Sequence, residues 1–143
     1  MDKSIQNVNE TYDQIALLYN LLNKLYFFGK DEKLRSWIVK NLNLKVHSKV
    51  LNLCSGTGLD IPVLLRKLNQ ETVTGVDLSI QMLRQTKHKQ QTRMINLVRA
   101  DIAHLPFRNK AFDAIMVSFC LTITQHIRQL LKRHPAFSKI LVE

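Results

Sequence analysis

From Lys49 onward the sequence alternates short apolar runs with segments of helical periodicity, and this alternation constrains the fold more than any other feature. The predicted strands are Val50–Leu53, Thr72–Asp77, Ile95–Val98, Ala114–Val117 and Ile140–Val142. Uninterrupted apolar strands are typical of a parallel sheet that is buried on both faces. Right-handed crossovers between such strands build an α/β fold with a doubly wound, Rossmann-like parallel sheet and helices on both faces.

The N-terminal part carries helical patterns instead, so we expect a helical extension (1–48) and a sheet domain (49–143) within a single compact unit. Residues 9–28 are predicted to form one helix that ends at Gly29, and Asp31 is predicted to cap the next helix. Apolar residues with helical spacing on the first helix predict a face buried in the core. This stripe comprises Ile15, Leu18, Tyr19, Leu22 and Leu25.

Composition limits the class of protein further. The 143 residues are 45% hydrophobic and 22% charged, which is typical of a single globular domain. The longest uncharged stretch, 114–127, is shorter than the roughly 20 apolar residues that a membrane-spanning helix needs, and residues 1–6 do not begin a secretory signal. We expect Cys54 and Cys120 to be reduced, buried small side chains. These features predict a cytoplasmic protein, and no His or Cys residues have metal-ligand spacing.

The charge balance is strongly basic. The chain has 21 Lys and Arg against 11 Asp and Glu, a net charge of +10. Positive charge favours nucleic acid, anionic lipid or anionic small molecules as partners. The basic residues are spread along the chain, however, and no aromatic residues are interleaved with them as a nucleic-acid platform requires. A basic solvated surface is the plainer interpretation, and binding to nucleic acid stays open as an alternative.

Glycines and acidic residues follow the predicted strands, where a doubly wound sheet binds its ligand. Gly56 and Gly58 follow the first strand and would let the backbone approach a ligand closely. Asp77 ends the second strand, 21 residues after Gly56, a position from which a carboxylate accepts hydrogen bonds from both ribose hydroxyls of an adenosine cofactor. Asp101, after the third strand, is expected to accept from the adenine amino group. The residues placed to enclose the adenine ring are Leu78, Met82 and Ile102.

The same loop discriminates between adenosine cofactors. A dinucleotide site requires a third glycine where this chain has Ile61. A carboxylate at Asp60, in the first turn of the following helix, would repel a pyrophosphate seated on the helix N-terminus, and the phosphate-binding pattern G-x-x-x-x-G-K-S/T is absent. A ligand that carries an ammonium and a sulfonium would tolerate this carboxylate. S-adenosylmethionine therefore fits the loop better than NAD or ATP.

Four sequence motifs, in this order and with similar gaps, resemble those of the class I S-adenosylmethionine-dependent methyltransferases. They are Val50–Gly58, Val73–Ser79 with Met82 and Leu83, Arg99–Asp101 with Leu105–Phe107, and Phe112–Ile115. The N-terminal stretch resembles the ubiquinone/menaquinone biosynthesis C-methyltransferases and their relatives. Its matching residues are Tyr12–Ala16, Tyr19, Asn20 and Asn23. The resemblance covers nearly the whole chain, from about Tyr12 to Glu143.

This resemblance implies an enzyme that transfers a methyl group from S-adenosylmethionine to a small-molecule or lipid-like, quinone-type acceptor. The cofactor-binding residues are then Tyr12, Tyr19, Asn52, Cys54, Ser55, Gly56, Gly58, Asp77, Leu78, Met82, Asp101, Ile102 and Ser118. We assign no catalytic residue, because methyl transfer from a sulfonium requires alignment and exclusion of water more than an acid–base pair.

The chain departs from the family pattern in two respects. The family usually has an acid at Asn52 and a glycine at Cys54, so we expect weaker cofactor binding. The last two strands of the family's sheet are absent, so we expect an exposed edge at Ile140–Val142 that a homodimer or a partner chain covers. Two alternatives to an active methyltransferase therefore stay open. One is an inactive cofactor-binding remnant or regulatory subunit, and the other is an RNA methyltransferase or nucleic-acid binder.

Overall fold

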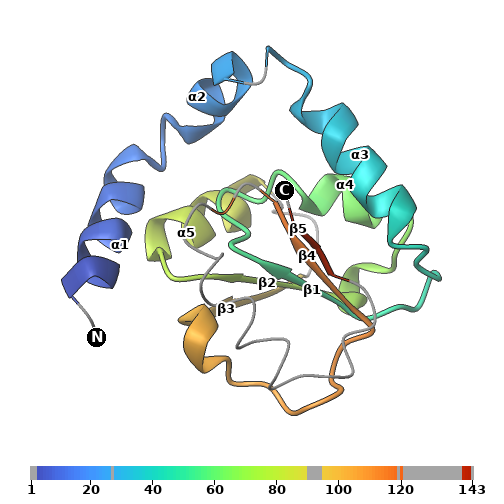
Figure 1. Cartoon of the computed structure of the whole chain (residues 1–143). Helices are drawn as coiled ribbons and strands as arrows, with labels where there is room; N and C mark the ends of the chain where they lie inside the picture. The colour runs from blue at the N-terminus through green and yellow to red at the C-terminus, as the bar shows by residue number, and fades with distance from the viewer. Residues whose placement is uncertain (1–2, 27, 90–94, 119, 121–139, 143) are drawn as a thin grey trace.

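Five strands run parallel in one sheet in the computed structural model of the chain (Figure 1). The structure describes residues 3–26, 28–89, 95–118, 120 and 140–142. The strands are β1 (Val50–Leu53), β2 (Val73–Asp77), β3 (Asn96–Arg99), β4 (Ala114–Val117) and β5 (Ile140–Val142). Their order is β3-β2-β1-β4-β5, so the chain moves outward from β1 to β3 and then returns to the other side of β1. The predicted Rossmann-like parallel sheet is confirmed.

The register brings the carboxyl ends of the central strands to one edge. Leu53 at the end of β1 pairs with Val76 of β2 on one side and with Val117 of β4 on the other. The direction in which strands are added reverses between β1 and β4, and this reversal is the topological switch point of the sheet. Residues that directly follow β1, β2 and β4 therefore meet at the position where such sheets bind ligands.

Three helices precede the sheet: α1 (Lys3–Ile15), α2 (Tyr19–Tyr26) and α3 (Asp31–Asn41). The prediction of one continuous helix over 9–28 is wrong, because residues 16–18 form a turn between α1 and α2. The turn lets α1 pack against α5 (Ile80–Lys89) while α2 continues toward α3 along the arch seen in Figure 1.

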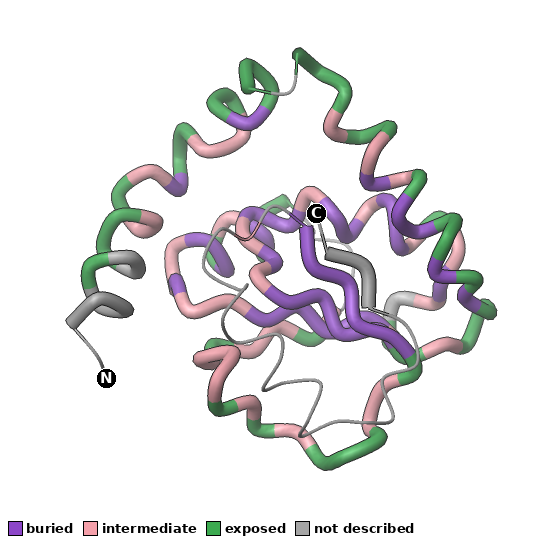
Figure 2. Tube along the Cα trace, viewed as in Figure 1, coloured by how far each residue is buried: buried purple, intermediate pink, exposed green. Residues whose placement is uncertain are grey.

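The apolar stripe on these helices is largely exposed, which corrects the predicted buried face. Leu18, Leu22 and Leu25 expose 59%, 47% and 64% of their surface, and α2 is mostly green in Figure 2. The physical reason is the position of α2. It lies over the carboxyl edge of the sheet, where it contributes polar contacts, instead of lying flat on the core. Asn23 is its buried residue.

The start of α3 also differs from the prediction. α2 ends at Tyr26, three residues before the predicted stop at Gly29, which has a left-handed φ of 71°. The residue before α3, however, is Lys30, and no side chain caps the helix. Asp31 is the first helical residue, and its carboxylate accepts a hydrogen bond from Asn23 Nδ2 at 3.2 Å instead. The predicted cap at Asp31 is therefore wrong, because the carboxylate joins α2 to α3.

The two faces of the sheet have different covers. On one face α3 and α4 (Ile61–Leu65) pack Ile38, Leu42 and Leu64 onto the apolar side chains of β1 and β4. On the other face the cover is the segment from the short 3-10 helix η2 (Ile102–His104) to Phe112. A further 3-10 turn, η1 (Gln70–Thr72), precedes β2. Residues 121–139 lie outside the described part of the chain.

Cys54 and Cys120 form a disulfide, which corrects the prediction of two reduced thiols. The two residues are 66 positions apart in sequence, but each follows one of the paired strands β1 and β4. Their Cα atoms are 6.0 Å apart, within the range of about 4.4–6.8 Å in which disulfides form. The bond therefore follows from parallel pairing, which places the ends of β1 and β4 side by side.

No helix in the described ranges has both the length and the apolar character needed to cross a membrane.

Candidate functional site

Asp77 organises the carboxyl edge of the sheet. Its Oδ2 accepts a hydrogen bond from the backbone N–H of Gly56 at 2.8 Å, and its Oδ1 accepts from the N–H of Ser79 at 2.9 Å. These bonds tie the end of β2 both to the loop that follows β1 and to the start of α5. A carboxylate oxygen has room for a second donor. Asp77 therefore keeps acceptor capacity at the end of β2, and its bonding to a ligand's ribose hydroxyls stays a prediction.

The environment of Asp77 shifts its acidity. Burial raises the pKa of the Asp77 carboxyl above its ordinary value of 3.8, and the negative charge of Asp13 acts in the same direction. Backbone N–H groups of Ser79, Gly56 and Leu78 oppose this shift because they stabilise the ionised form. A raised pKa at a carboxyl beside a strand end is a feature that functional sites share.

Two residues of α5 hold the glycine loop (Gly56–Gly58) in place, and the sequence did not identify them as functional residues. The Thr86 hydroxyl donates to the carbonyl oxygen of Gly56 at 2.9 Å, and Lys89 Nζ donates to the carbonyl oxygen of Thr57 at 3.3 Å. Gly58 has a φ of 77°, and a Cβ at this position would lie 2.7 Å from Thr86 Cγ2. The loop thus requires glycine at position 58 both for its backbone conformation and for the close approach of α5.

Two tyrosines from the N-terminal helices lie over this loop. The rings of Tyr12 and Tyr19 have their centroids 6.4 Å apart, and Tyr19 Cε1 lies 4.0 Å from the point that a Cβ on Gly56 would occupy. Burial raises the pKa of both hydroxyls, and the charge of Asp77 adds to both shifts. The structure therefore brings Tyr12 and Tyr19 to the same edge as Gly56 and Asp77, as a lid formed by the two rings over a bound cofactor requires. Contact of the rings with the cofactor stays a prediction.

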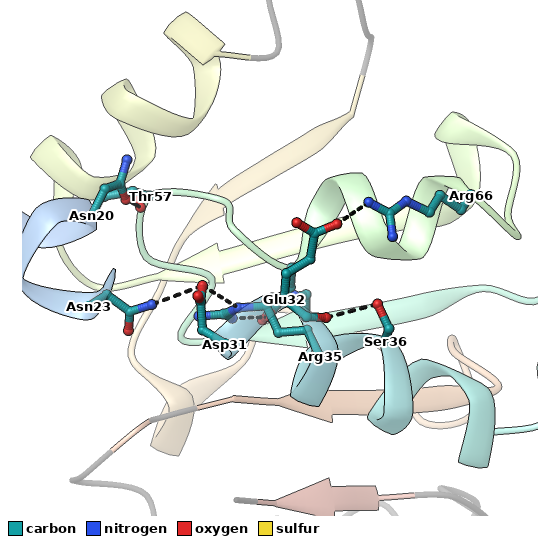
Figure 3. Close-up of polar contacts among 10 residues, drawn as sticks. Asn20, Asn23, Asp31, Glu32, Arg35, Ser36, Thr57 and Arg66 are labelled. Carbon is teal, nitrogen blue, oxygen red and sulfur yellow. Dashed lines mark hydrogen bonds and ion pairs between the residues drawn. The ribbon is translucent and has the colours of Figure 1, made fainter. Parts of the chain in front are cut away.

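Polar contacts fix these helices in place. Asp13 on α1 accepts hydrogen bonds from the Ser79 hydroxyl and, at 3.2 Å, from the backbone N–H of Gln81. Asn20 on α2 accepts a hydrogen bond from the Thr57 hydroxyl, as Figure 3 shows. Asp13 and Asn20 lie within the N-terminal stretch that carries the family resemblance. That resemblance is the signal that could have identified them as anchors of the lid.

A buried polar network lies behind the loop. Arg35 on α3 pairs with Asp60, and Asn52 Nδ2 donates to Asp60 Oδ2 at 2.9 Å. Arg35 Nε also lies 3.8 Å from Asp31 Oδ2, and Figure 3 shows Arg35 and Asp31 beside α2. The prediction that Asp60 acts as an uncompensated carboxylate that repels a pyrophosphate is wrong, because the guanidinium of Arg35 compensates its charge.

Three buried polar atoms at the ends of β1 and β4 have no hydrogen-bond partner among the described residues. They are Asn52 Oδ1, Ser55 Oγ and Ser118 Oγ. Asn52 lies in β1, Ser55 lies in the loop after β1, and Ser118 directly follows the neighbouring strand β4. Buried polar atoms without partners are rare in folded proteins and are costly unless a ligand or water satisfies them. Their presence at this edge fits a polar ligand that reaches into the switch point.

The predicted adenine side lies beyond β3. Asp101 Oδ1 accepts from the backbone N–H of Ala103 at 2.9 Å and so caps η2, while its second oxygen lies 3.4 Å from the His104 ring. Leu78 and Ile102 are half-buried. Met82 is almost fully buried, so Leu78 and Ile102 offer most of the accessible apolar surface. Contact of these four residues with adenine stays a prediction.

The strand order and the glycine loop define a class of protein, and solved structures confirm the class I methyltransferase fold. The chain is 27% identical to an S-adenosylmethionine-dependent methyltransferase from Clostridium acetobutylicum, with a TM-score of 0.63 over 82% of this chain and 48% of that one. The fold of the cyclase SpnF is also similar, with a TM-score of 0.72 at 18% identity over 90% of this chain and 54% of that one.

Residues 1–139 match the ubiE/COQ5 methyltransferase family, and the chain belongs to this family. It is 36% identical over 118 residues to the demethylmenaquinone methyltransferase of Thermotoga maritima, a match that covers 82% of this chain and 50% of that protein. It is 29% identical over 119 residues to the ubiquinone/menaquinone biosynthesis C-methyltransferase UbiE of Geotalea daltonii, covering 80% of this chain and 51% of that protein. The chain thus spans about half the length of the curated relatives it matches.

Proposed function

We propose that this chain binds S-adenosylmethionine at the carboxyl edge of β1, β2 and β4 and takes part in methylating a quinone-type acceptor. The observation that carries the proposal is the position of Asp77, which holds the glycine loop through Gly56 and retains acceptor capacity at the end of β2. When bound, S-adenosylmethionine supplies an activated methyl group on its sulfonium.

The described residues divide the recognition of this ligand between them. Asp77 accepts hydrogen bonds from the ribose hydroxyls, each such charge-assisted bond contributing about 1.5–3 kcal/mol. The unpartnered oxygens of Asn52, Ser55 and Ser118 supply acceptors and donors for the polar methionine end. Tyr12 and Tyr19 lie over the loop and exclude water.

The residue at position 52 affects the affinity for the ammonium group of S-adenosylmethionine. An acid at this position would attract the ligand's ammonium, and Asn52 supplies only a carbonyl dipole there. Asp60 lies directly behind Asn52, but its charge is compensated by Arg35. We therefore propose that the chain binds the ammonium through the neutral Oδ1 of Asn52, with lower affinity than a site that carries an acid at this position.

The acceptor is proposed from the family alone. Relatives in the family include proteins named demethylmenaquinone methyltransferases, and these names support a ring carbon of a quinone-type lipid as the methylated atom. Methylation of a ring carbon also requires a base that removes a proton. The described residues do not identify this base, so the chain's own contribution to that step is left unassigned.

Product formation tests the proposal. The purified chain is incubated with S-adenosylmethionine that carries an isotopically labelled methyl group and a short-chain demethylmenaquinone, and labelled product is measured by mass spectrometry. At S-adenosylmethionine concentrations below saturation, we expect product with the native chain and at least about tenfold less with Asp77→Asn. If the chain binds S-adenosylhomocysteine but forms no product, the proposed enzyme activity is contradicted and the alternative of a cofactor-binding subunit is supported. Methylation of RNA in place of the quinone would move the proposal to the nucleic-acid alternative.

A further inference from the structure

The disulfide between Cys54 and Cys120 crosses the topological switch point. Cys54 directly follows β1 and Cys120 lies three residues after β4. β1 and β4 are the neighbouring strands between which the order of the sheet reverses. Ligands of doubly wound sheets bind outside the carboxyl ends of the strands at this point. A covalent bond therefore joins the two sides of the position where the proposed cofactor binds.

Cys54 is also part of the loop that contacts this ligand. Its φ of 52° lies in the left-handed region that favours glycine. The next residue, Ser55, donates its N–H to the carbonyl oxygen of Val76 at 2.9 Å. The carbonyl oxygen of Cys54 lies 3.8 Å from the point that a Cβ on Gly56 would occupy. A bond to the Cys54 sulfur therefore acts directly on the glycine loop.

Each cysteine is half-buried and packs against the buried core cluster without being part of it. Oxidation by a low-molecular-weight disulfide proceeds in two exchanges. One cysteine thiolate attacks the small disulfide and releases one small thiol, and the second cysteine then displaces the other. In total the two cysteines lose two protons and two electrons, and the small disulfide becomes two thiols. A small dithiol reverses the reaction.

We propose that Cys54 and Cys120 form a redox-sensitive pair whose oxidation weakens cofactor binding. This inference rests on the proposed function. The disulfide holds the loop after β1 against the residue after β4 and occupies the switch point with two sulfur atoms. Reduction releases the loop and opens the edge beside Asn52 and Ser118, whose buried oxygens are available to a ligand. The reduced chain is the form that binds.

Calorimetric titration with S-adenosylhomocysteine tests the inference on the native chain in two states. One sample is reduced with a phosphine, and the other is oxidised with glutathione disulfide and then freed of reagent. We expect the reduced chain to bind at least about tenfold more tightly, a difference well within the resolution of the method. Cys120→Ser lies outside the proposed binding residues and is assayed without glutathione disulfide, which would leave a mixed disulfide on its remaining Cys54. It is expected to bind like the reduced native chain with or without the phosphine.

The outcomes separate this inference from the proposed function. Equal affinities in the two states would overturn the redox control and leave the proposed function intact. No binding in either state would overturn both. Thiol titration of the native chain adds a readout that does not depend on any variant. Two thiols that persist in excess glutathione disulfide would overturn the inference, even if Cys120→Ser failed to fold.

Discussion

Asp77 Oδ2 and the backbone N–H of Gly56 lie 2.8 Å apart although 21 residues separate them in sequence. The bond joins the end of β2 to the loop after β1, and the second oxygen of the same carboxylate holds Ser79 at the start of α5. One side chain thus positions the loop and also retains the lone pairs that a ribose would use.

The first prediction concerns pH. Because burial raises the pKa of Asp77 above 3.8, we expect S-adenosylhomocysteine affinity to fall on acidification at a pH higher than an ordinary aspartate would cause. The Asp77 carboxyl affects the free energy of unfolding in the opposite direction. Its stabilising contribution is full below pH 3.8 and is lost as the pH rises through the raised pKa of the folded state. Calorimetry and thermal melts over this pH window should therefore show slopes of opposite sign, and a flat affinity profile would contradict the assignment.

The second prediction separates backbone strain from steric overlap at Gly58. We expect Gly58→Ala to lower the free energy of unfolding by about 2–4 kcal/mol, since it combines an unfavourable φ with overlap onto Thr86. Gly29→Ala is the matched control. Its φ is 71°, but no atom lies within 4 Å of the new Cβ, so we expect only about 1 kcal/mol. Equal losses in urea denaturation of the two variants would contradict the close approach of α5.

The third prediction concerns the buried pair of Arg35 and Asp60. Removing one partner leaves the other charge buried, so we expect Arg35→Met to lower the free energy of unfolding by about 3–5 kcal/mol. The double variant with Asp60→Leu should recover part of this loss. The exposed pair of Glu32 and Arg66 is the control, and Arg66→Met should leave the free energy of unfolding nearly unchanged. Similar losses in the free energy of unfolding at the two ion pairs would contradict the expectation that burial sets the cost of removing one partner.

The fourth prediction concerns the edge strand β5. Within the described sheet this strand pairs only with β4, so its other edge is unpaired among the described residues. An unpaired parallel edge is a site for association with another chain. We expect sedimentation velocity to show a dimer of this chain at micromolar concentration. A monomer over the whole concentration range would contradict association through β5.

The comparison of sequence and structure shows which features are local. The strands and the glycine loop could be predicted because apolar runs and glycines are consecutive in sequence, and Val50–Leu53 and Ala114–Val117 match the predicted strands residue for residue. The hydroxyl oxygen of Ser79 accepts from the Met82 N–H at 3.1 Å, a local cap at the start of α5. Asp77 could be placed because it ends its strand.

Contacts between distant segments could not be predicted in the same way. The disulfide of Cys54 and Cys120 depends on the pairing of β1 with β4, and no local pattern predicts this contact between residues 66 positions apart in sequence. The pairing of Arg35 with Asp60 depends on how α3 lies against α4, and no local pattern encodes that orientation. The exposure of Leu18 and Leu25 has the same origin, because periodicity identifies an apolar face but not what covers it.

The most direct measurement is calorimetric titration of the reduced native chain with S-adenosylhomocysteine, alongside Asp77→Asn and Asp113→Asn. Asp113 accepts a hydrogen bond from the Lys49 N–H at the opposite end of β1. Asp113→Asn therefore makes the same substitution at a position away from the proposed site and serves as the control. We predict saturable binding to the native chain and to Asp113→Asn, and a loss of at least about tenfold in Asp77→Asn, as expected for one charged hydrogen bond. Equal affinities for all three chains, or no heat of binding with the native chain, would contradict the account.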